Sequence, residues 1–220
     1  MKNKILLKVF IIYLAFIYGC LFLPAGSFMY WEAWIYSVVL FIPLIITVSY
    51  LHKKDPALLE RRMRFKEKEE KQKIIAKFFT LPFLLGFLIP GFDFRFNWSE
   101  IPVALVIAAN IMVFLGYILV FFVFRENSYA SRIVEVEKEQ KVISTGPYSV
   151  VRHPMYTGII FMFLFTPIAL GSWYAMIVFI FLPVIIIFRI YNEEKYLCEN
   201  LPGYIGYRQK TRFRIIPYIW

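Results

Sequence analysis

Six apolar runs, separated by shorter polar segments, dominate this chain. Because a transmembrane helix needs about 20 apolar residues, the second, fourth and sixth runs are long enough to cross a bilayer. The third and fifth runs are shorter and indicate tilted helices or a helical hairpin. In chain order the runs cover residues 5–24, 31–51, 74–90, 101–124, about 156–170 and 173–190.

The link between the last two runs is very short. Only Gly171 and Ser172 separate them, which favours a helical hairpin. Composition agrees with a membrane protein, since 60% of the residues are hydrophobic and the mean hydropathy is +0.63. We therefore predict an all-α integral membrane protein with about six transmembrane helices and a C-terminal hairpin. Because there is no internal repeat or low-complexity linker, we expect one domain over residues 1–220.

The basic residues predict the orientation in the membrane. With six spans, all of the 25 Lys and Arg residues except Arg95 fall on one side. The positive-inside rule then puts both termini and the large loops in the cytoplasm. The net charge of +10 follows from this topology, so it does not indicate a nucleic-acid partner.

The first apolar run could be mistaken for a secretory signal peptide. Lys8 interrupts the run and the bulky Tyr18 stands next to the only loose cleavage pattern, so we expect a retained helix. The two cysteines, Cys20 and Cys198, belong to the first run and to the cytoplasmic tail. They predict neither a disulfide nor a metal site.

The loop after the second run is densely charged. Asp55 followed by Pro56 is typical of a helix start. Residues 61–73 carry charges of both signs and suit a solvated helix on anionic head groups. The alternative is a flap over a cytoplasmic site.

A polar motif just before the fifth run is the main candidate for chemistry. Pro154 suits the start of a helix, which puts Arg152 and His153 directly before its N-terminus. Free N–H groups and the helix dipole there favour a bound carboxylate or phosphate. Tyr156 follows on the first turn, and Gly146 opens a turn that lets the backbone approach a ligand.

Two acidic residues complete this candidate site. Glu193 and Glu194 stand where the sixth run ends, so a hairpin would return them to the level of His153. One carboxylate could then bind an amine or ribose hydroxyls opposite the Arg/His pole, which suits a zwitterionic, nucleoside-like ligand. The alternative is that all these charges are ordinary groups at the membrane interface. The sequence contains no Gly-x-Gly-x-x-Gly, no P-loop and no metal-ligand cluster.

These residues resemble a known family. The pattern Arg152-His153-Pro154-x-Tyr156-x-Gly158, followed by Glu193-Glu194, is similar to the signature of isoprenylcysteine carboxyl methyltransferases, whose wider superfamily includes phospholipid methyltransferases. The resemblance is strongest over residues 138–220, the expected cofactor-binding core, and weaker over residues 1–125, the N-terminal spans and basic loop. The earlier segments resemble bacterial members, which implies a bacterial inner membrane.

The resemblance implies a cofactor and a set of site residues. The cofactor would be S-adenosylmethionine, bound in a cytoplasm-facing pocket without a Rossmann domain. A lipophilic acceptor would enter from the bilayer through a cleft between spans. The implied cofactor residues are Lys141, Gly146, Tyr148, Arg152, His153, Tyr156, Glu193 and Glu194. The implied acceptor-side residues are Tyr207, Lys210 and Arg212, with Glu194 as the base if the acceptor is an amine.

Other functions stay open at this point. The acceptor could be a prenylated carboxylate, a phospholipid amine or a small thiol. A membrane reductase is an alternative, since some sterol reductases have a similar Arg-His-Pro-x-Tyr motif and use NADPH. A non-enzymatic scaffold or small transporter is a further alternative. In every case we expect no metal and no nucleic acid.

Overall fold

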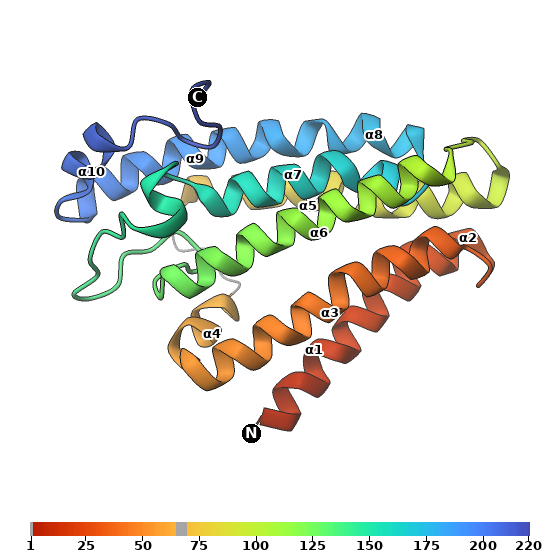
Figure 1. Ribbon diagram of the computed structural model, residues 1–220, viewed down its shortest axis with the longest axis horizontal. Helices are drawn as coiled ribbons and strands as arrows, with labels where there is room; N and C mark the ends of the chain where they lie inside the picture. The colour runs from red at the N-terminus through yellow and green to blue at the C-terminus, as the bar shows by residue number, and fades with distance from the viewer. Residues whose placement is uncertain (1, 65–69) are drawn as a thin grey trace.

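The computed structural model describes residues 2–64 and 70–220, and all regular structure in these residues is helical (Figure 1). The long helices pack lengthwise, and α10 lies beside the end of α9. The main helices are α1 (Lys2–Ile17), α3 (Trp31–Lys54), α4 (Pro56–Arg62), α5 (Glu70–Phe96), α6 (Val103–Glu126), α7 (Pro154–Ala169), α8 (Trp173–Phe179), α9 (Phe181–Asn200) and α10 (Tyr204–Lys210). Short turns of other helix types cover Tyr18–Phe22, Leu23–Ala25 (α2) and Gly146–Ser149.

Within the described residues, four helical stretches are long and apolar enough to cross a membrane, and the chain is an integral membrane protein. They are Trp31–Lys54, Glu70–Phe96, Val103–Glu126 and Trp173–Asn200, with shorter apolar helices at Val9–Ala25 and Pro154–Ala169. All six predicted runs are therefore helical. The short third run lies within the 27-residue helix α5, which continues beyond the run at both ends and is one of these four stretches.

Close packing of α6 against α7 sets the position of the site. A Cβ added at Gly158 would lie 2.8 Å from the Gly116 carbonyl oxygen, and one at Gly116 would lie 2.9 Å from the Gly158 carbonyl oxygen. Small residues on facing helices allow their backbones to approach. The Gly158 of the sequence motif thus serves helix packing, one turn below the polar end of α7.

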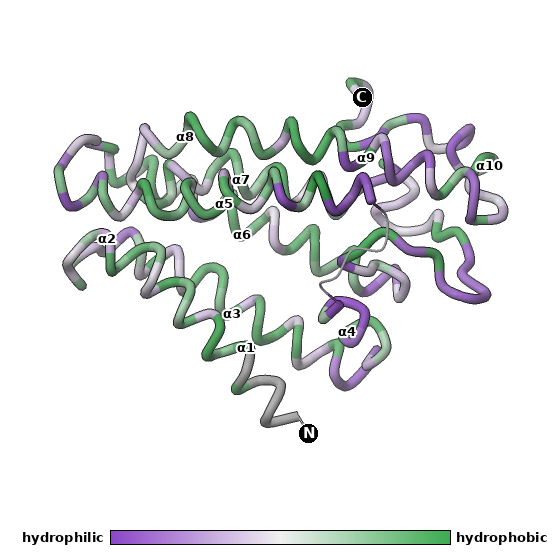
Figure 2. The backbone as a smooth tube through the Cα atoms, turned by 180° about the vertical axis from the view of Figure 1, so that it is seen from behind, coloured by the Kyte–Doolittle hydropathy of each residue, from purple (hydrophilic) through white to green (hydrophobic). Residues whose placement is uncertain are grey.

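The charged loop is described in part. Asp55 caps α4, because its Oδ1 accepts a hydrogen bond of 2.9 Å from the Leu58 N–H, which confirms the predicted helix start. Residues 65–69, within the segment predicted to be a solvated helix or a flap, lie outside the described residues. Figure 2 shows the hydrophilic backbone concentrated at the end of the bundle that holds α4, the end of α9 and α10.

Candidate active site

The chain's last segment folds back onto the start of α7. His153 precedes Pro154 at the helix start, as predicted. The backbone N–H of Arg152 donates to the Phe213 carbonyl at 2.9 Å, and that of His153 donates to the Arg214 carbonyl at 2.8 Å. These two N–H groups are therefore occupied by the tail and are not free to bind an anion, contrary to the expectation from the sequence.

The hairpin brings Glu194 to the level of Arg152 and His153, which confirms the predicted convergence. The Arg152 Nε donates to Glu194 Oε1 at 2.7 Å, and His153 Nε2 lies 3.3 Å from the same oxygen. Arg214 from the tail donates to Glu194 Oε2 at 3.0 Å. Glu194 is only 3% exposed, so this ion-pair network is buried.

Arg152 bonds to three protein groups through its Nε and Nη1 atoms. Besides Glu194, its Nη1 donates to the carbonyls of Thr211 and Arg212, at 2.8 and 2.6 Å. The guanidinium thereby joins α7, α9 and the tail. Its role here is to hold three segments together.

Glu193 has a different environment from that of its neighbour. Its Oε2 accepts a hydrogen bond of 2.7 Å from the Tyr156 hydroxyl, which itself accepts one of 2.8 Å from Arg189 Nε. His153 Nδ1 lies 3.8 Å from Glu193 Oε1. The Glu193 side chain is 22% exposed, compared with 4% for Glu194. Glu193 therefore faces open space while its carboxylate is held in place.

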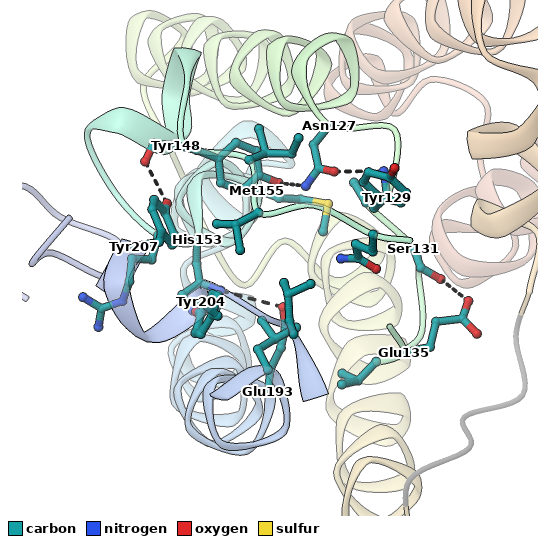
Figure 3. Close-up of a pocket in the computed structure, with 18 of the residues that line it drawn as sticks. Asn127, Tyr129, Ser131, Glu135, Tyr148, His153, Met155, Glu193, Tyr204 and Tyr207 are labelled. Atoms are coloured by element: carbon teal, nitrogen blue, oxygen red, sulfur yellow. Dashed lines mark hydrogen bonds and ion pairs between the residues drawn. The ribbon is translucent and has the colours of Figure 1, made fainter. Parts of the chain in front are cut away.

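That space is a pocket between the α7 start, the α9 end, α10 and the loop after α6 (Figure 3). Figure 3 shows Tyr148, His153 and Tyr207 on one side and Ser131 and Glu135 on the other. Seven residues predicted for the site line it: Lys141, Tyr148, Arg152, His153, Tyr156, Glu193 and Tyr207.

Three tyrosines form one wall of the pocket. The Tyr148 hydroxyl accepts a hydrogen bond of 2.8 Å from Asn127, and the Tyr207 hydroxyl donates one of 2.7 Å to the Tyr148 carbonyl. Burial raises the pKa of the Tyr207 phenol to about 12 and raises that of Tyr148 as well, so both stay protonated near neutral pH. The Tyr204 hydroxyl is buried and has no hydrogen-bond partner among the described residues.

Four residues predicted for the site do not line this pocket. Gly146 has a φ of +55°, and a Cβ there would lie 2.9 Å from Glu126 Oε2, so it serves a tight turn. Glu194 lies within the ion-pair network described above. Lys210 and Arg212 are exposed on the tail, because positions 204 and 207 are the ones that the short α10 turns inward.

Several pocket residues were missed at the sequence level. Arg189 could have been found, since it precedes Glu193 by four residues and so shares its helix face. Asn127 and Ser131 had no such signal, because they belong to an irregular loop whose path depends on tertiary contacts. Arg214, which belongs to the ion-pair network with Glu194 rather than to the pocket lining, was also not predicted.

The chain was compared with protein families, curated proteins and solved structures. Residues 104–202 match the phospholipid methyltransferase family. No match was found among curated proteins. The chain is similar to a solved eukaryotic intramembrane Ras methyltransferase, an isoprenylcysteine carboxyl methyltransferase, with 19% identity and a TM-score of 0.48. That likeness covers 86% of this chain and 75% of the other.

The matched segment contains the residues around which the pocket is built. It includes Arg152, His153 and Tyr156 at the start of α7 and Glu193 near the end of α9. The family resemblance drawn from the sequence motif is thereby confirmed. Residues 104–202, a little under half of the chain, match the phospholipid methyltransferase family, and this match supports a membrane methyltransferase.

Proposed function

We propose that this protein transfers a methyl group from S-adenosylmethionine to a lipophilic acceptor, in a reaction most like that of isoprenylcysteine carboxyl methyltransferases. One observation carries the proposal: a tethered carboxylate, Glu193, and an unpartnered buried hydroxyl, that of Tyr204, line the same pocket. Leaving a buried polar group unsatisfied costs about 1–3 kcal/mol, so a ligand that bonds to it is favoured.

The donor set fits the parts of this cofactor. Glu193 can accept hydrogen bonds from an amine or from ribose hydroxyls, and Lys141, in the same lining, can pair with a carboxylate. Apolar side chains form much of the remaining wall and suit a purine and a thioether chain. They are Ile133, Val134, Val142, Ile143, Leu197 and Leu201.

The two glutamates have separate tasks in this proposal. Glu194 holds α7, α9 and the tail together through Arg152 and Arg214. Glu193 binds the cofactor, and Tyr156 with Arg189 fixes its carboxylate so that little rotamer freedom is lost on binding. Glu194 is thus a poor candidate for a general base, because its oxygens are already bonded within the protein.

The cofactor, when bound, supplies a methyl group on a sulfonium that is already a good leaving group. A carboxylate acceptor then needs no general base. The chain's own residues have to align donor and acceptor and exclude water, and these two effects supply most of the rate. The tyrosine wall and the folded-back tail serve both purposes.

The proposal also includes an orientation. The segments that line the pocket belong to the hydrophilic end of the bundle in Figure 2, and most Lys and Arg residues of the sequence belong to the loops and tail at that end. By the positive-inside rule this end and both termini face the cytoplasm, in a six-span arrangement. The acceptor's apolar tail would reach the pocket from the bilayer, in the inner membrane of a bacterium.

Titration calorimetry on the purified protein tests the cofactor. We expect a saturable heat with S-adenosylmethionine and none with NADPH. Transfer of a labelled methyl group from S-adenosylmethionine into the organic phase of a lipid extract then tests the reaction class. Binding of NADPH instead of S-adenosylmethionine would favour the reductase alternative, and binding of neither would overturn the proposal.

A further inference from the structure

The exposed face of α9 changes from apolar to charged near the end of the helix. Its large exposed side chains recur every three or four residues, which places them on one face. They are Phe181, Val184, Phe188 and Tyr191. The next exposed residues along the helix, Lys195 and Glu199, are charged. Because α9 belongs to a stretch that is apolar enough to cross a membrane, this change puts the boundary between lipid and water just after Tyr191.

Residues 215–220 pack against α9 at this boundary. The centroid of the Trp220 ring lies 5.7 Å from that of the Tyr191 ring. Ile215 is buried in an apolar cluster with Ile190, and Trp220 packs against the same cluster. Figure 1 shows the end of the chain above α9, on the side turned away from α6. Segment 215–220 therefore lies beside the last apolar turns of α9, at the level where the bilayer meets water.

The outer surface of segment 215–220 is apolar and open. Its sequence, Ile-Ile-Pro-Tyr-Ile-Trp, contains no charged side chain. Ile216 is 43% exposed, Ile219 is 77% exposed and Tyr218 is 90% exposed. Contiguous exposed apolar surface marks an interaction site, and Tyr and Trp are enriched where a bilayer meets water. The composition and the position of this segment thus agree.

The backbone of the segment is bonded within itself. The Trp220 carbonyl oxygen accepts hydrogen bonds of 2.8, 3.0 and 3.2 Å from three N–H groups, those of Arg214, Ile215 and Ile216. The N–H groups of Ile219 and Trp220 both donate to the Ile216 carbonyl, at 3.2 and 3.1 Å. Backbone groups that enter lipid have to be satisfied within the protein. This turn can therefore enter the membrane interface without leaving these donors unpaired.

The inner surface of the segment supports the wall of the pocket. The Ile215 carbonyl accepts a hydrogen bond of 2.8 Å from the Thr157 hydroxyl of α7. The two preceding carbonyls accept from the last two N–H groups before α7. The Arg214 guanidinium, which bonds to Glu194, also lies over the Trp220 ring, 5.0 Å from its centroid. One side of the segment thus holds the start of α7, and the other side is open.

We propose that segment 215–220 docks on the lipid bilayer, with the side chains of Ile216, Tyr218 and Ile219 inserted into the leaflet next to the pocket. Lipid is the occupant because the segment continues the apolar exposed stripe of α9 and carries no charge for a polar partner. The bilayer then stabilises the contact between the segment and the start of α7, so that the membrane helps to complete the pocket wall. The proposal does not depend on which cofactor or acceptor the pocket binds.

A nitroxide label measures the depth of the segment in the membrane. The full-length chain, with Cys20→Ala and Cys198→Ala, is labelled at Ile219→Cys and reconstituted at one chain per vesicle in phosphatidylethanolamine and phosphatidylglycerol. Ile205→Cys is the matched control, because Ile205 is an exposed isoleucine on α10, beyond the charged end of α9. We expect oxygen, which partitions into lipid, to reach the label at position 219 better than a water-soluble nickel chelate does. The reverse should hold at position 205.

Two results of the depth measurement would overturn the proposal. The first is the same ratio of oxygen to nickel accessibility at both positions, which would mean that the bilayer boundary does not separate them. The second is protection of position 219 in native membranes but not in vesicles of the purified protein. Because such vesicles hold a single chain and no other protein, that result would assign the apolar surface to a protein partner.

Hydrogen exchange, followed by NMR in the same vesicles, tests the support of the pocket wall. Replacing both Ile216 and Ile219 by Ser should make the N–H groups of Arg152 and His153 exchange about tenfold faster, equivalent to about 1.4 kcal/mol. Ile205→Ser should leave their exchange unchanged. Exchange at the wild-type rate in the double variant, or equally fast exchange in Ile205→Ser, would overturn the link between the bilayer and the pocket wall.

Discussion

Two polar clusters, one at the link between α7 and α8 and one at the start of α7, are satisfied in different ways. Figure 1 shows that these two segments lie at opposite ends of α7. In the first, the carboxylate of Asp93 accepts hydrogen bonds from the N–H and the hydroxyl of Ser99, both at 2.7 Å, and from the Ser172 hydroxyl. In the second, Glu193 faces a pocket and the Tyr204 hydroxyl has no partner in the described part of the chain. The protein closes the Asp93 cluster with its own groups and leaves the other able to bind a ligand.

This comparison separates stability from function. A buried group bonded on all sides contributes to folding and has little capacity left for a ligand. A group that is held in place but lacks some of its hydrogen bonds makes the folded protein less stable and remains able to bind a ligand. The site itself contains both kinds of group. Glu194 is bonded within the protein, whereas the adjacent Glu193 faces the pocket.

The largest expected effect is the loss of the Glu194 network. Replacing Arg152 by Met removes one partner of a buried ion pair and frees two tail carbonyls. We expect a loss of about 3–5 kcal/mol in the free energy of unfolding, seen as a lower melting temperature. Arg212→Gln is the control, because its side chain is exposed. Equal melting temperatures for the two variants would show that the network contributes little.

The second prediction separates the two glutamates by function. Glu193→Gln should weaken S-adenosylmethionine binding at least tenfold, about 1.4 kcal/mol, with a nearly unchanged melting temperature. Glu194→Gln should lower the melting temperature, because it weakens the pairs with Arg152 and Arg214. Calorimetry and thermal unfolding on both variants measure this. If Glu193→Gln binds the cofactor normally, Glu193 has no binding role.

The third prediction concerns the closed cluster. Ser172→Ala removes the hydroxyl that bonds Asp93 and that caps α8 by accepting from the Ala175 N–H at 3.1 Å. We expect a loss of about 1 kcal/mol in stability and no change in cofactor affinity, since this cluster is remote from the pocket. Weaker cofactor binding in Ser172→Ala would mean that the two ends are coupled.

The fourth prediction concerns the Tyr204 hydroxyl, whose removal should weaken cofactor binding and leave stability unchanged, the reverse of Ser172→Ala. Tyr204→Phe removes a buried hydroxyl that lacks a partner, so the free protein should be no less stable. Cofactor affinity should fall by about 1 kcal/mol, the net value of one hydrogen bond. A drop in melting temperature without the cofactor would instead indicate that this hydroxyl already has a partner in the folded protein.

The tail cations should have the smallest effect. Lys210→Gln and Arg212→Gln change side chains that are exposed and outside the pocket lining. We expect near-wild-type methyl transfer and cofactor affinity in both. Turnover measured with any acceptor from a lipid extract checks this, and a selective loss of turnover would restore these cations to the acceptor side.

The helices were largely predictable, because long apolar runs have few alternatives in a bilayer. The hairpin could be predicted from the two-residue link at Gly171 and Ser172, and it brought Glu194 to His153 as expected. The full length of α5 could not be predicted in this way, because helix propensity and packing, rather than hydropathy, extend the helix beyond residues 74–90.

The different environments of the Glu193 and Glu194 side chains could not be predicted from the sequence. Adjacent helix positions point about 100° apart, so the side chain that faces the pocket depends on how α9 is rotated against α7.

The bonds between the tail and the start of α7 have a consequence for biosynthesis. The N–H groups of Arg152 and His153 obtain their carbonyl partners from residues 213 and 214, which are synthesised about sixty residues later. Until those residues leave the ribosome, the wall of the pocket is incomplete even if every helix has entered the membrane. A nascent chain therefore lacks a complete pocket wall during insertion, until residues 213 and 214 have emerged and bonded to the start of α7.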